Sequence, residues 1–171
     1  MMNLITRTDT LLFHWLFNKT NADNSNWIRL ISKTGDGYLY LVAGITLYLF
    51  EPEHGALFLY SALLAYSLEL PLYVILKKSF KRQRPCDLLI NFKAHISPSD
   101  KFSLPSGHTA AAFLMASLLA HFYPGISLLV YAWAAFIGLS RVLLGVHYPS
   151  DIVVGALLGK TISLLSLLIL L

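Results

Sequence analysis

The sequence predicts an all-α protein, an integral membrane helical bundle of about five spanning helices with interfacial helices before it. Of its 171 residues, 56% are hydrophobic and only 13% are charged, and the mean hydropathy is +0.63. That composition is too apolar for a soluble domain of this size. Apolar stretches also alternate with short polar turns, and a spanning helix needs about 20 mostly apolar residues.

The first element, residues 1–34, is expected to be an amphipathic segment that lies in the membrane interface, and residues 35–171 are expected to form the embedded bundle. Charged residues interrupt the apolar run near the N-terminus, which argues against a signal peptide there. Trp15 and Trp27 are suited to anchoring this segment among lipid headgroups. Arg7, Asp9 and His14 interrupt the apolar core that a signal peptide would need, and Arg7, Asp9 and Lys19 make the segment amphipathic.

Five apolar stretches follow, and each is a candidate spanning helix. The first is short, so the spanning helix must include flanking residues or cross a thinned region of the bilayer. Turns containing Pro separate some of them, and a long polar loop at 77–105 separates the second from the third. Two spans lie between that loop and the turn at 145–149, so both fall on one membrane face. The stretches are residues 38–50, 55–76, 107–123, 126–144 and 149–171.

Three motifs are predicted to meet on that face. They read K-x6-R-P, P-S-G-H and S-R-x5-H-x3-D, and together they supply three cations, two histidines and one carboxylate. Each is common by chance, but their order and completeness make the set informative. Their principal residues are Lys77, Arg84, Ser106, Gly107, His108, Arg141, His147 and Asp151.

These residue types suit a phosphoryl group. Arg84 and Arg141 carry planar guanidinium groups, each of which can donate two hydrogen bonds to a pair of phosphate oxygens, and Lys77 adds a point charge. Ser106 and Gly107 are expected at a helix start, where free backbone N–H groups and the helix dipole favour an anion.

With these motifs, residues 36–160 resemble the type 2 phosphatidic acid phosphatase superfamily, which includes membrane lipid phosphate and pyrophosphate phosphatases. The resemblance implies that His147 attacks phosphorus to form a phosphohistidine, and that His108 protonates the leaving oxygen and then activates water. Asp151 lies four residues after His147, about one helical turn, so spacing itself predicts that it orients His147 rather than His108.

The expected substrate is therefore a membrane lipid phosphate or pyrophosphate, of the undecaprenyl pyrophosphate, phosphatidic acid or phosphatidylglycerol phosphate class. We expect no cofactor, no metal and no nucleic-acid partner; the partners are the substrate and the bilayer, and the oligomeric state stays open. The alternatives are a lipid phosphotransferase that uses the same site, a vanadium haloperoxidase, and a non-catalytic membrane scaffold or transporter.

The location is expected to be the cell (inner) membrane, crossed several times. Twelve of the thirteen Lys and Arg residues fall on the N-terminal and motif-bearing face, which by the positive-inside rule favours the cytoplasm. The resemblance instead implies a site at the periplasmic or outer face, and we expect that face.

Further expectations concern charged residues outside the motifs. Glu69 and Lys160 lie within apparent spans at matching depths, about 12–14 Å below the motif-bearing face, so we expect them to pair inside the bundle. The basic residues near the second span are expected to anchor lipid headgroups, and Gly35-Asp36-Gly37 is explained as a turn before a helix. Those basic residues are Lys78, Lys81 and Arg82.

Overall fold

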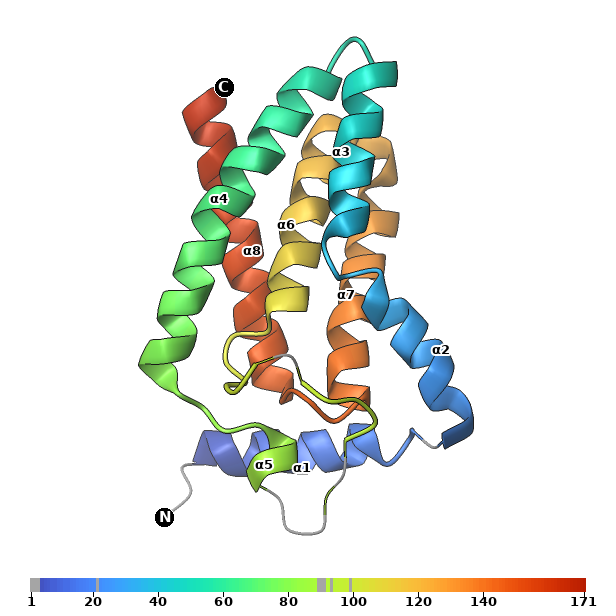
Figure 1. Ribbon diagram of the computed structural model, residues 1–171, viewed down its shortest axis with the longest axis vertical. Coiled ribbons are helices and arrows are strands. Elements are labelled where there is room, and N and C mark those ends of the chain that lie inside the picture. The colour runs from blue at the N-terminus through green and yellow to red at the C-terminus, as the bar shows by residue number, and fades with distance from the viewer. Residues whose placement is uncertain (1–3, 21, 89–91, 93, 99) are drawn as a thin grey trace.

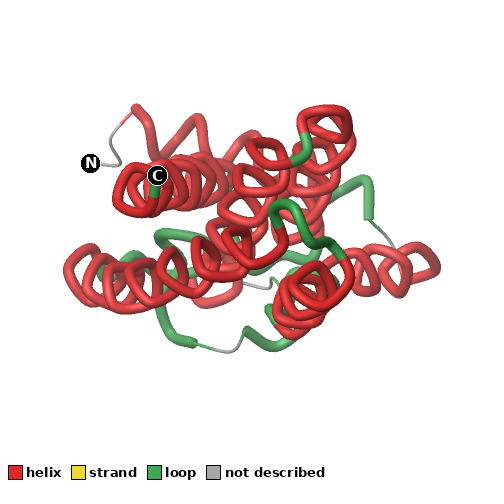
Figure 2. Tube along the Cα trace, turned by 90° about the horizontal axis from the view of Figure 1, so that it is seen from above, coloured by secondary structure: helices red, strands yellow, loops and turns green. Residues whose placement is uncertain are grey.

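The computed structural model describes residues 4–20, 22–88, 92, 94–98 and 100–171. Among these residues it contains helices and loops but no strand (Figure 2). The predicted all-α fold is therefore confirmed. The elements are α1 (Leu4–Phe17), α2 (Ala22–Lys33), α3 (Tyr38–Phe50), α4 (Gly55–Phe80), α5 (Pro85–Leu88), α6 (Gly107–Phe122), the short 3₁₀ turn η1 (Pro124–Ile126), α7 (Ser127–Leu143) and α8 (Pro149–Leu170).

The helices that run along the length of the molecule are α3, α4, α6, α7 and α8 (Figure 1). Helix α6 packs against α4, α7 and α8. Its contact with α8 is very close, because a Cβ at Gly159 would overlap the Ala110 carbonyl and one at Gly155 would lie 2.6 Å from the Ser106 carbonyl oxygen. Glycine at these two positions lets the backbones touch, and this contact holds the start of α6 beside the start of α8.

The bundle is a multi-pass membrane protein. Three stretches are long and apolar enough to cross a bilayer: Gly55–Leu88, Pro124–Leu143 and Pro149–Leu170. Helices α3 and α6 are apolar but shorter, with 13 and 16 residues. A 16-residue helix is only about 24 Å long, less than the roughly 30 Å of the hydrocarbon core. Helix α6 tolerates this shortness because most of its side chains are buried against its neighbours.

Helix α4 is longer than the predicted second span. It continues through Pro71 to Phe80, and Lys77 and Lys78 lie in its last turn. Cations there interact favourably with the carbonyl end of the helix dipole, and Lys81 ends the helix in the left-handed conformation (φ 49°). Lys77 is thus carried by a helix rather than by the polar loop.

The N-terminal helices pack on the motif-bearing end of the bundle. Helix α1 crosses beneath it and contacts α7 and α8, and α2 leans against α7 (Figure 1). Phe13 of α1 is fully buried beside Val142 and Tyr148. Trp15 and Trp27 are exposed, as headgroup anchors would be, and the division of the chain at residue 35 stays a prediction.

The expected pair between Glu69 and Lys160 does not form. Glu69 is buried at 2% exposure, where it lines a pocket between α3, α4 and α6, whereas Lys160 is exposed on the outside of α8. The matching depths were a poor guide because rotation about the helix axis also matters. Gly155 and Gly159 face α6, and the residue after Gly159 is turned about 100° away from that contact.

Candidate active site

The three motifs meet at one end of the bundle. The end of α4, the start of α6, the end of α7 and the start of α8 lie together there, above α1 (Figure 1). Lys77 comes from α4, Arg84 from the loop just before α5, and His147 from the short connection between α7 and α8. Hydropathy alone predicted this common face, and in the structure Arg84 contacts His147, which in turn faces Asp151.

A carboxylate lies where Lys77 and Arg84 converge. The Asp100 Oδ1 atom accepts hydrogen bonds from Lys77 Nζ at 2.5 Å and Arg84 Nη2 at 2.7 Å, and Oδ2 accepts one from the Tyr73 hydroxyl at 2.9 Å. Burial by itself raises the pKa of Asp100, but the hydrogen bonds from Lys77 and Arg84 outweigh it and lower the pKa to about 2. Three donors thus point at one anion-binding position.

Arg84 connects this position to His147. Its side chain is 1% exposed, and Nη1 donates to the Val146 carbonyl at 2.7 Å and lies 3.2 Å from His147 Nε2. Nε donates to the backbone carbonyl of Asp100. A guanidinium held by two carbonyls keeps its fork in one orientation, so the anion position and the Nε2 face of His147 are fixed relative to each other.

His147 is buried and faces Asp151 with its other ring nitrogen. Nδ1 lies 3.5 Å from Asp151 Oδ2, so the predicted pair meets, although this distance exceeds that of an ordinary N–H···O hydrogen bond. Burial lowers the pKa of His147 to about 4, aided by Arg84 and Arg141 and opposed by Asp151. The imidazole is therefore neutral at physiological pH, as a nucleophile must be.

Asp151 is itself held by an ion network that the sequence did not suggest. Its Oδ2 accepts from the Tyr148 amide at the start of α8, and its Oδ1 accepts from Arg82 Nη1 at 2.7 Å. Arg82 also donates to Asp9 of α1 at 2.5 Å. Arg82 is therefore not a headgroup anchor. It joins α1 to the start of α8, whereas Lys78 and Lys81 are exposed.

The start of α6 differs from expectation in one respect. Ser106 is the N-terminal cap residue, but its amide donates to the Asp151 carbonyl at 3.1 Å, and its hydroxyl accepts from Thr109 at 2.9 Å. The Ser106 N–H is therefore not free for a phosphate, and this residue ties α6 to α8. Gly107 follows as the first helical residue, packed so closely on Tyr73 that a Cβ there would lie 2.9 Å from its ring.

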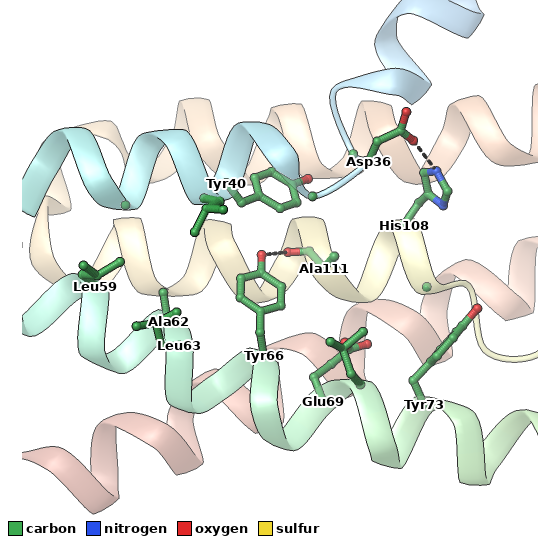
Figure 3. A pocket seen from close by; sticks show the side chains of 16 residues that line it. Asp36, Tyr40, Leu59, Ala62, Leu63, Tyr66, Glu69, Tyr73, His108 and Ala111 are labelled. Carbon is green, nitrogen blue, oxygen red and sulfur yellow. Dashed lines mark hydrogen bonds and ion pairs between the residues drawn. The ribbon is translucent and has the colours of Figure 1, made fainter.

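His108 contacts a residue that sequence analysis assigned to a simple turn. Its Nε2 lies 2.8 Å from Asp36 Oδ1 (Figure 3). Asp36 stands between Gly35, which packs against Ile137 and His108, and Gly37, whose φ of 91° favours glycine. The turn before α3 thus presents a carboxylate to His108. A sequence signal was available, since an acidic residue between two glycines begins a helix on the motif-bearing face.

Arg141 has different hydrogen-bond partners from the other two cations. Its side chain is 5% exposed, and Nη1 donates to the Ser32 hydroxyl of α2 at 2.7 Å. Its Nε has no hydrogen-bond partner among the described residues, so part of its guanidinium group can bind a further acceptor. The structure therefore separates Lys77 and Arg84, which hold Asp100, from Arg141, which is oriented by the N-terminal segment.

A cavity of about 530 Å³ opens beside this site between α3, α4 and α6. Figure 3 shows His108 and Tyr73 at one end and Leu59, Ala62 and Leu63 at the other. The cavity thus changes from polar to apolar as it leaves the motif-bearing end. An amphiphile with a charged headgroup has the same order of polarity.

Comparison with known proteins agrees with the resemblance seen in the motifs. Residues 55–171, which contain all three motifs, match the sequence model of the PAP2 superfamily. The lipid A 1-phosphatase of Rhizobium johnstonii is 30% identical over 99 residues, 56% of this chain and 41% of the relative. The decaprenylphosphoryl-5-phosphoribose phosphatase of Mycobacterium tuberculosis is 41% identical over 93 residues, 52% of this chain and 48% of the relative. The matches span less than half of these curated relatives.

Solved structures share the whole architecture. The crystal structure of Aquifex aeolicus LpxE superimposes with a TM-score of 0.81 at 31% identity, over 92% of this chain and 93% of that one. The first transmembrane PAP2 type phosphatidylglycerolphosphate phosphatase from Bacillus subtilis superimposes with a TM-score of 0.78 at 23% identity, over 98% of this chain and 87% of that one. The second likeness shows the same fold.

Proposed function

The chain belongs to the PAP2 superfamily, and we propose that it hydrolyses the terminal phosphate of a membrane lipid phosphate or pyrophosphate. The observation that carries this proposal is the position of the Asp100 carboxylate, held by Lys77, Arg84 and Tyr73. A phosphoryl group offers the same kind of acceptor oxygens to these donors. Arg84 Nη1 is also 3.2 Å from the neutral His147 Nε2, so an anion bound there meets a nucleophile.

In the first step the substrate phosphate replaces Asp100, and Lys77 and Arg84 neutralise its oxygens. His147 Nε2 attacks phosphorus, so that an N–P bond forms and the P–O bond to the lipid breaks. His108 donates its proton to the departing oxygen. Burial and the charge of Arg141 lower the pKa of His108 to about 4, so His108 needs anionic partners to carry a proton at neutral pH. Asp36, 2.8 Å from His108 Nε2, is one of these partners, and the bound phosphate supplies the other.

In the second step water attacks the phosphohistidine. His108, now neutral, takes a proton from that water as the new P–O bond forms and the N–P bond breaks. Phosphate leaves and His147 returns to its starting state, with Nδ1 facing Asp151. The positive charge of Lys77, Arg84 and Arg141 supplies transition-state stabilisation through preorganised donors.

The cavity supports a lipid substrate. It reaches from His108 along α4 to Leu59 and Ala62 in the apolar part of the bundle, so a chain could lie there while its phosphate faces His147. The names of the relatives, a lipid A 1-phosphatase and a decaprenylphosphoryl-5-phosphoribose phosphatase, also favour a lipid-linked phosphate. Undecaprenyl pyrophosphate, phosphatidic acid and phosphatidylglycerol phosphate are all candidates.

We also propose that the protein lies in the inner membrane with this site at the outer face. Cys86, the only cysteine in the chain, is partly exposed in α5 at the motif-bearing end and offers a direct test. A membrane-impermeant maleimide should label it in intact cells. Gly125→Cys in a Cys86→Ser background, at the opposite end of the bundle, should be protected. The reverse pattern would place the site in the cytoplasm.

The experiment that tests the proposed activity is phosphate release by detergent-purified protein with EDTA present. The three candidate lipids should be assayed in parallel, with His147→Ala as the blank. Release by the parent protein alone supports the hydrolase. Release that requires a second lipid as acceptor would support a phosphotransferase, and no turnover under either condition would favour a non-catalytic role.

A further inference from the structure

Two polar groups on opposite walls of the cavity have no partner among the residues that the structure describes. The Glu69 side chain of α4 makes no hydrogen bond or ion pair with any residue that the structure describes, although the residue is only 2% exposed. The Tyr40 hydroxyl of α3 is also buried without a hydrogen-bond partner among those residues. Both residues line the cavity beside the candidate active site.

The neighbouring polar groups differ in this respect. The Tyr66 hydroxyl donates to the Ala111 carbonyl at 3.0 Å, and the Tyr73 hydroxyl donates to Asp100 at 2.9 Å. Glu69 lies between these two tyrosines along α4 (Figure 3). Buried polar groups are almost always hydrogen-bonded, since leaving one unsatisfied is unfavourable. Two unsatisfied groups that share one cavity therefore indicate a ligand.

The depth of these groups identifies the part of a lipid that they would meet. Glu69 lies four residues before Tyr73 on α4, which corresponds to about 6 Å along the helix, and the Tyr73 hydroxyl donates to the Asp100 carboxylate that marks the phosphate position. Beyond Glu69 the cavity is lined by Tyr66, Leu63 and Leu59. A lipid whose phosphate is held by Lys77 would place its backbone region, between phosphate and chains, beside Glu69 and Tyr40.

We propose that Glu69 and Tyr40 select lipids that carry hydroxyl or amide N–H groups in this backbone region. A carboxyl oxygen accepts such donors, and the Tyr40 hydroxyl both donates and accepts. Lipids with only ester oxygens there, or only a prenyl chain, offer no donor to the ionised Glu69 carboxylate and are disfavoured when it is ionised. This proposal rests on the proposed hydrolase activity and names the substrate class of that same site.

The test compares two phosphates that each carry two chains of matched length. Ceramide 1-phosphate has an amide N–H and a hydroxyl close to its phosphate, whereas phosphatidic acid has ester oxygens and no donor there. At alkaline pH, where the Glu69 carboxyl is ionised, we expect the parent protein to favour ceramide 1-phosphate in kcat/KM by about ten-fold, the effect of one well-placed hydrogen bond to a carboxylate. Glu69→Leu should abolish that preference by lowering kcat/KM for ceramide 1-phosphate, while kcat/KM for phosphatidic acid should stay unchanged.

Two tyrosines supply the matched control. Tyr40 and Tyr66 stack on each other at 6.2 Å between ring centroids, and both line the cavity, but only the Tyr66 hydroxyl is already bonded within the protein. Tyr40→Phe should lower the ratio of the two kcat/KM values several-fold, because it removes an uncommitted hydroxyl. Tyr66→Phe should change the two kcat/KM values equally.

The outcomes separate this inference from the activity on which it rests. Dodecyl phosphate, which has no backbone donor, reports the chemistry alone, and no release from any of the three compounds would overturn the proposed hydrolase. The proposed selection would be overturned if all three compounds are hydrolysed and neither Glu69→Leu nor Tyr40→Phe alters the ratio of kcat/KM for ceramide 1-phosphate to that for phosphatidic acid. Bound water would then be the partner of both groups. If Glu69→Leu does not give a folded protein by size-exclusion chromatography, the comparison of Tyr40→Phe with Tyr66→Phe decides.

Discussion

The two histidines of the site stand in contrasting surroundings. His147 is on a fixed side, 2% exposed and enclosed by Asp151 and Arg84. His108 is on an open side, where its side chain is 24% exposed and contacts Asp36 next to the cavity. On the fixed side, Arg84 and Asp151 each make several hydrogen bonds. On the open side, the Tyr40 hydroxyl has no hydrogen-bond partner among the described residues.

This difference matches two tasks of one site. A nucleophile needs a single orientation and a neutral ring, which burial and a rigid guanidinium provide. A general acid must reach an oxygen that enters and leaves with the substrate, so it belongs where the cavity opens. The following predictions test this division of roles between the two histidines, beginning with the variant whose activity should fall most.

His147→Ala should have the largest effect. Without Nε2 no phosphohistidine can form, and turnover should fall by about 10⁴-fold or more, as when a covalent nucleophile is removed from other hydrolases. Initial-rate measurements of phosphate release would show this. Size-exclusion chromatography should show an unchanged fold. Substantial activity in the folded variant would contradict the proposed covalent mechanism.

Asp151→Asn should impair turnover less completely, by roughly 10²-fold, because it removes the charge that opposes Arg84 and Arg141 around His147 but leaves the nucleophile. It also breaks the bond from Arg82, so part of the effect should appear as lower thermal stability. Asp9→Asn disturbs Arg82 from α1 without touching His147 and separates the two contributions. Equal losses of kcat in both variants would assign Asp151 a purely structural role.

Asp36→Asn tests the open side. Removal of the carboxylate leaves His108 without an anionic partner, so less of it is protonated, and kcat should fall about ten-fold. The alkaline limb of the rate profile should move to lower pH, because His108 then loses its proton more easily. A fall in kcat with an unmoved limb would mean that Asp36 only shapes the turn.

Asp100→Asn should improve binding. The Asp100 carboxylate competes with phosphate for Lys77 and Arg84, and the neutral amide competes more weakly, so KM should fall several-fold with kcat nearly unchanged. Asp87→Asn removes an exposed carboxylate from the same loop region and serves as the control. A higher KM in Asp100→Asn alone would show that Asp100 helps to arrange the cations.

The ionisation of His147 should have the smallest effect on activity at neutral pH. His147 has its pKa lowered to about 4, and only the neutral ring attacks. The acid limb of kcat/KM should therefore lie near pH 4, where activity falls to half of its plateau, rather than near the usual value of about 6.5. Recovery of activity on return to pH 7 would exclude unfolding, and an acid limb near 6.5 would show that His147 is not buried in solution.

The fold and most of the candidate site followed from the sequence because both depend on short-range patterns. Apolar length predicts spanning helices, and counting spans places loops on one face. The four-residue spacing of His147 and Asp151 predicts their meeting, because it corresponds to one helical turn. The span ends were less accurate, since α4 continues past Lys77 to Phe80.

Contacts between distant segments were decided by the tertiary structure alone. Depth along a helix can be counted, but the direction in which a side chain points across the bundle depends on helix rotation, which separated Glu69 from Lys160. The paths of the loops brought Asp36 to His108, Asp100 to Arg84 and Arg82 to Asp151. The sequence therefore predicted a membrane bundle with the candidate phosphate-binding and nucleophilic residues at one end. Only the packing of its helices decided which carboxylate holds each of these residues and which polar groups stay open to a substrate.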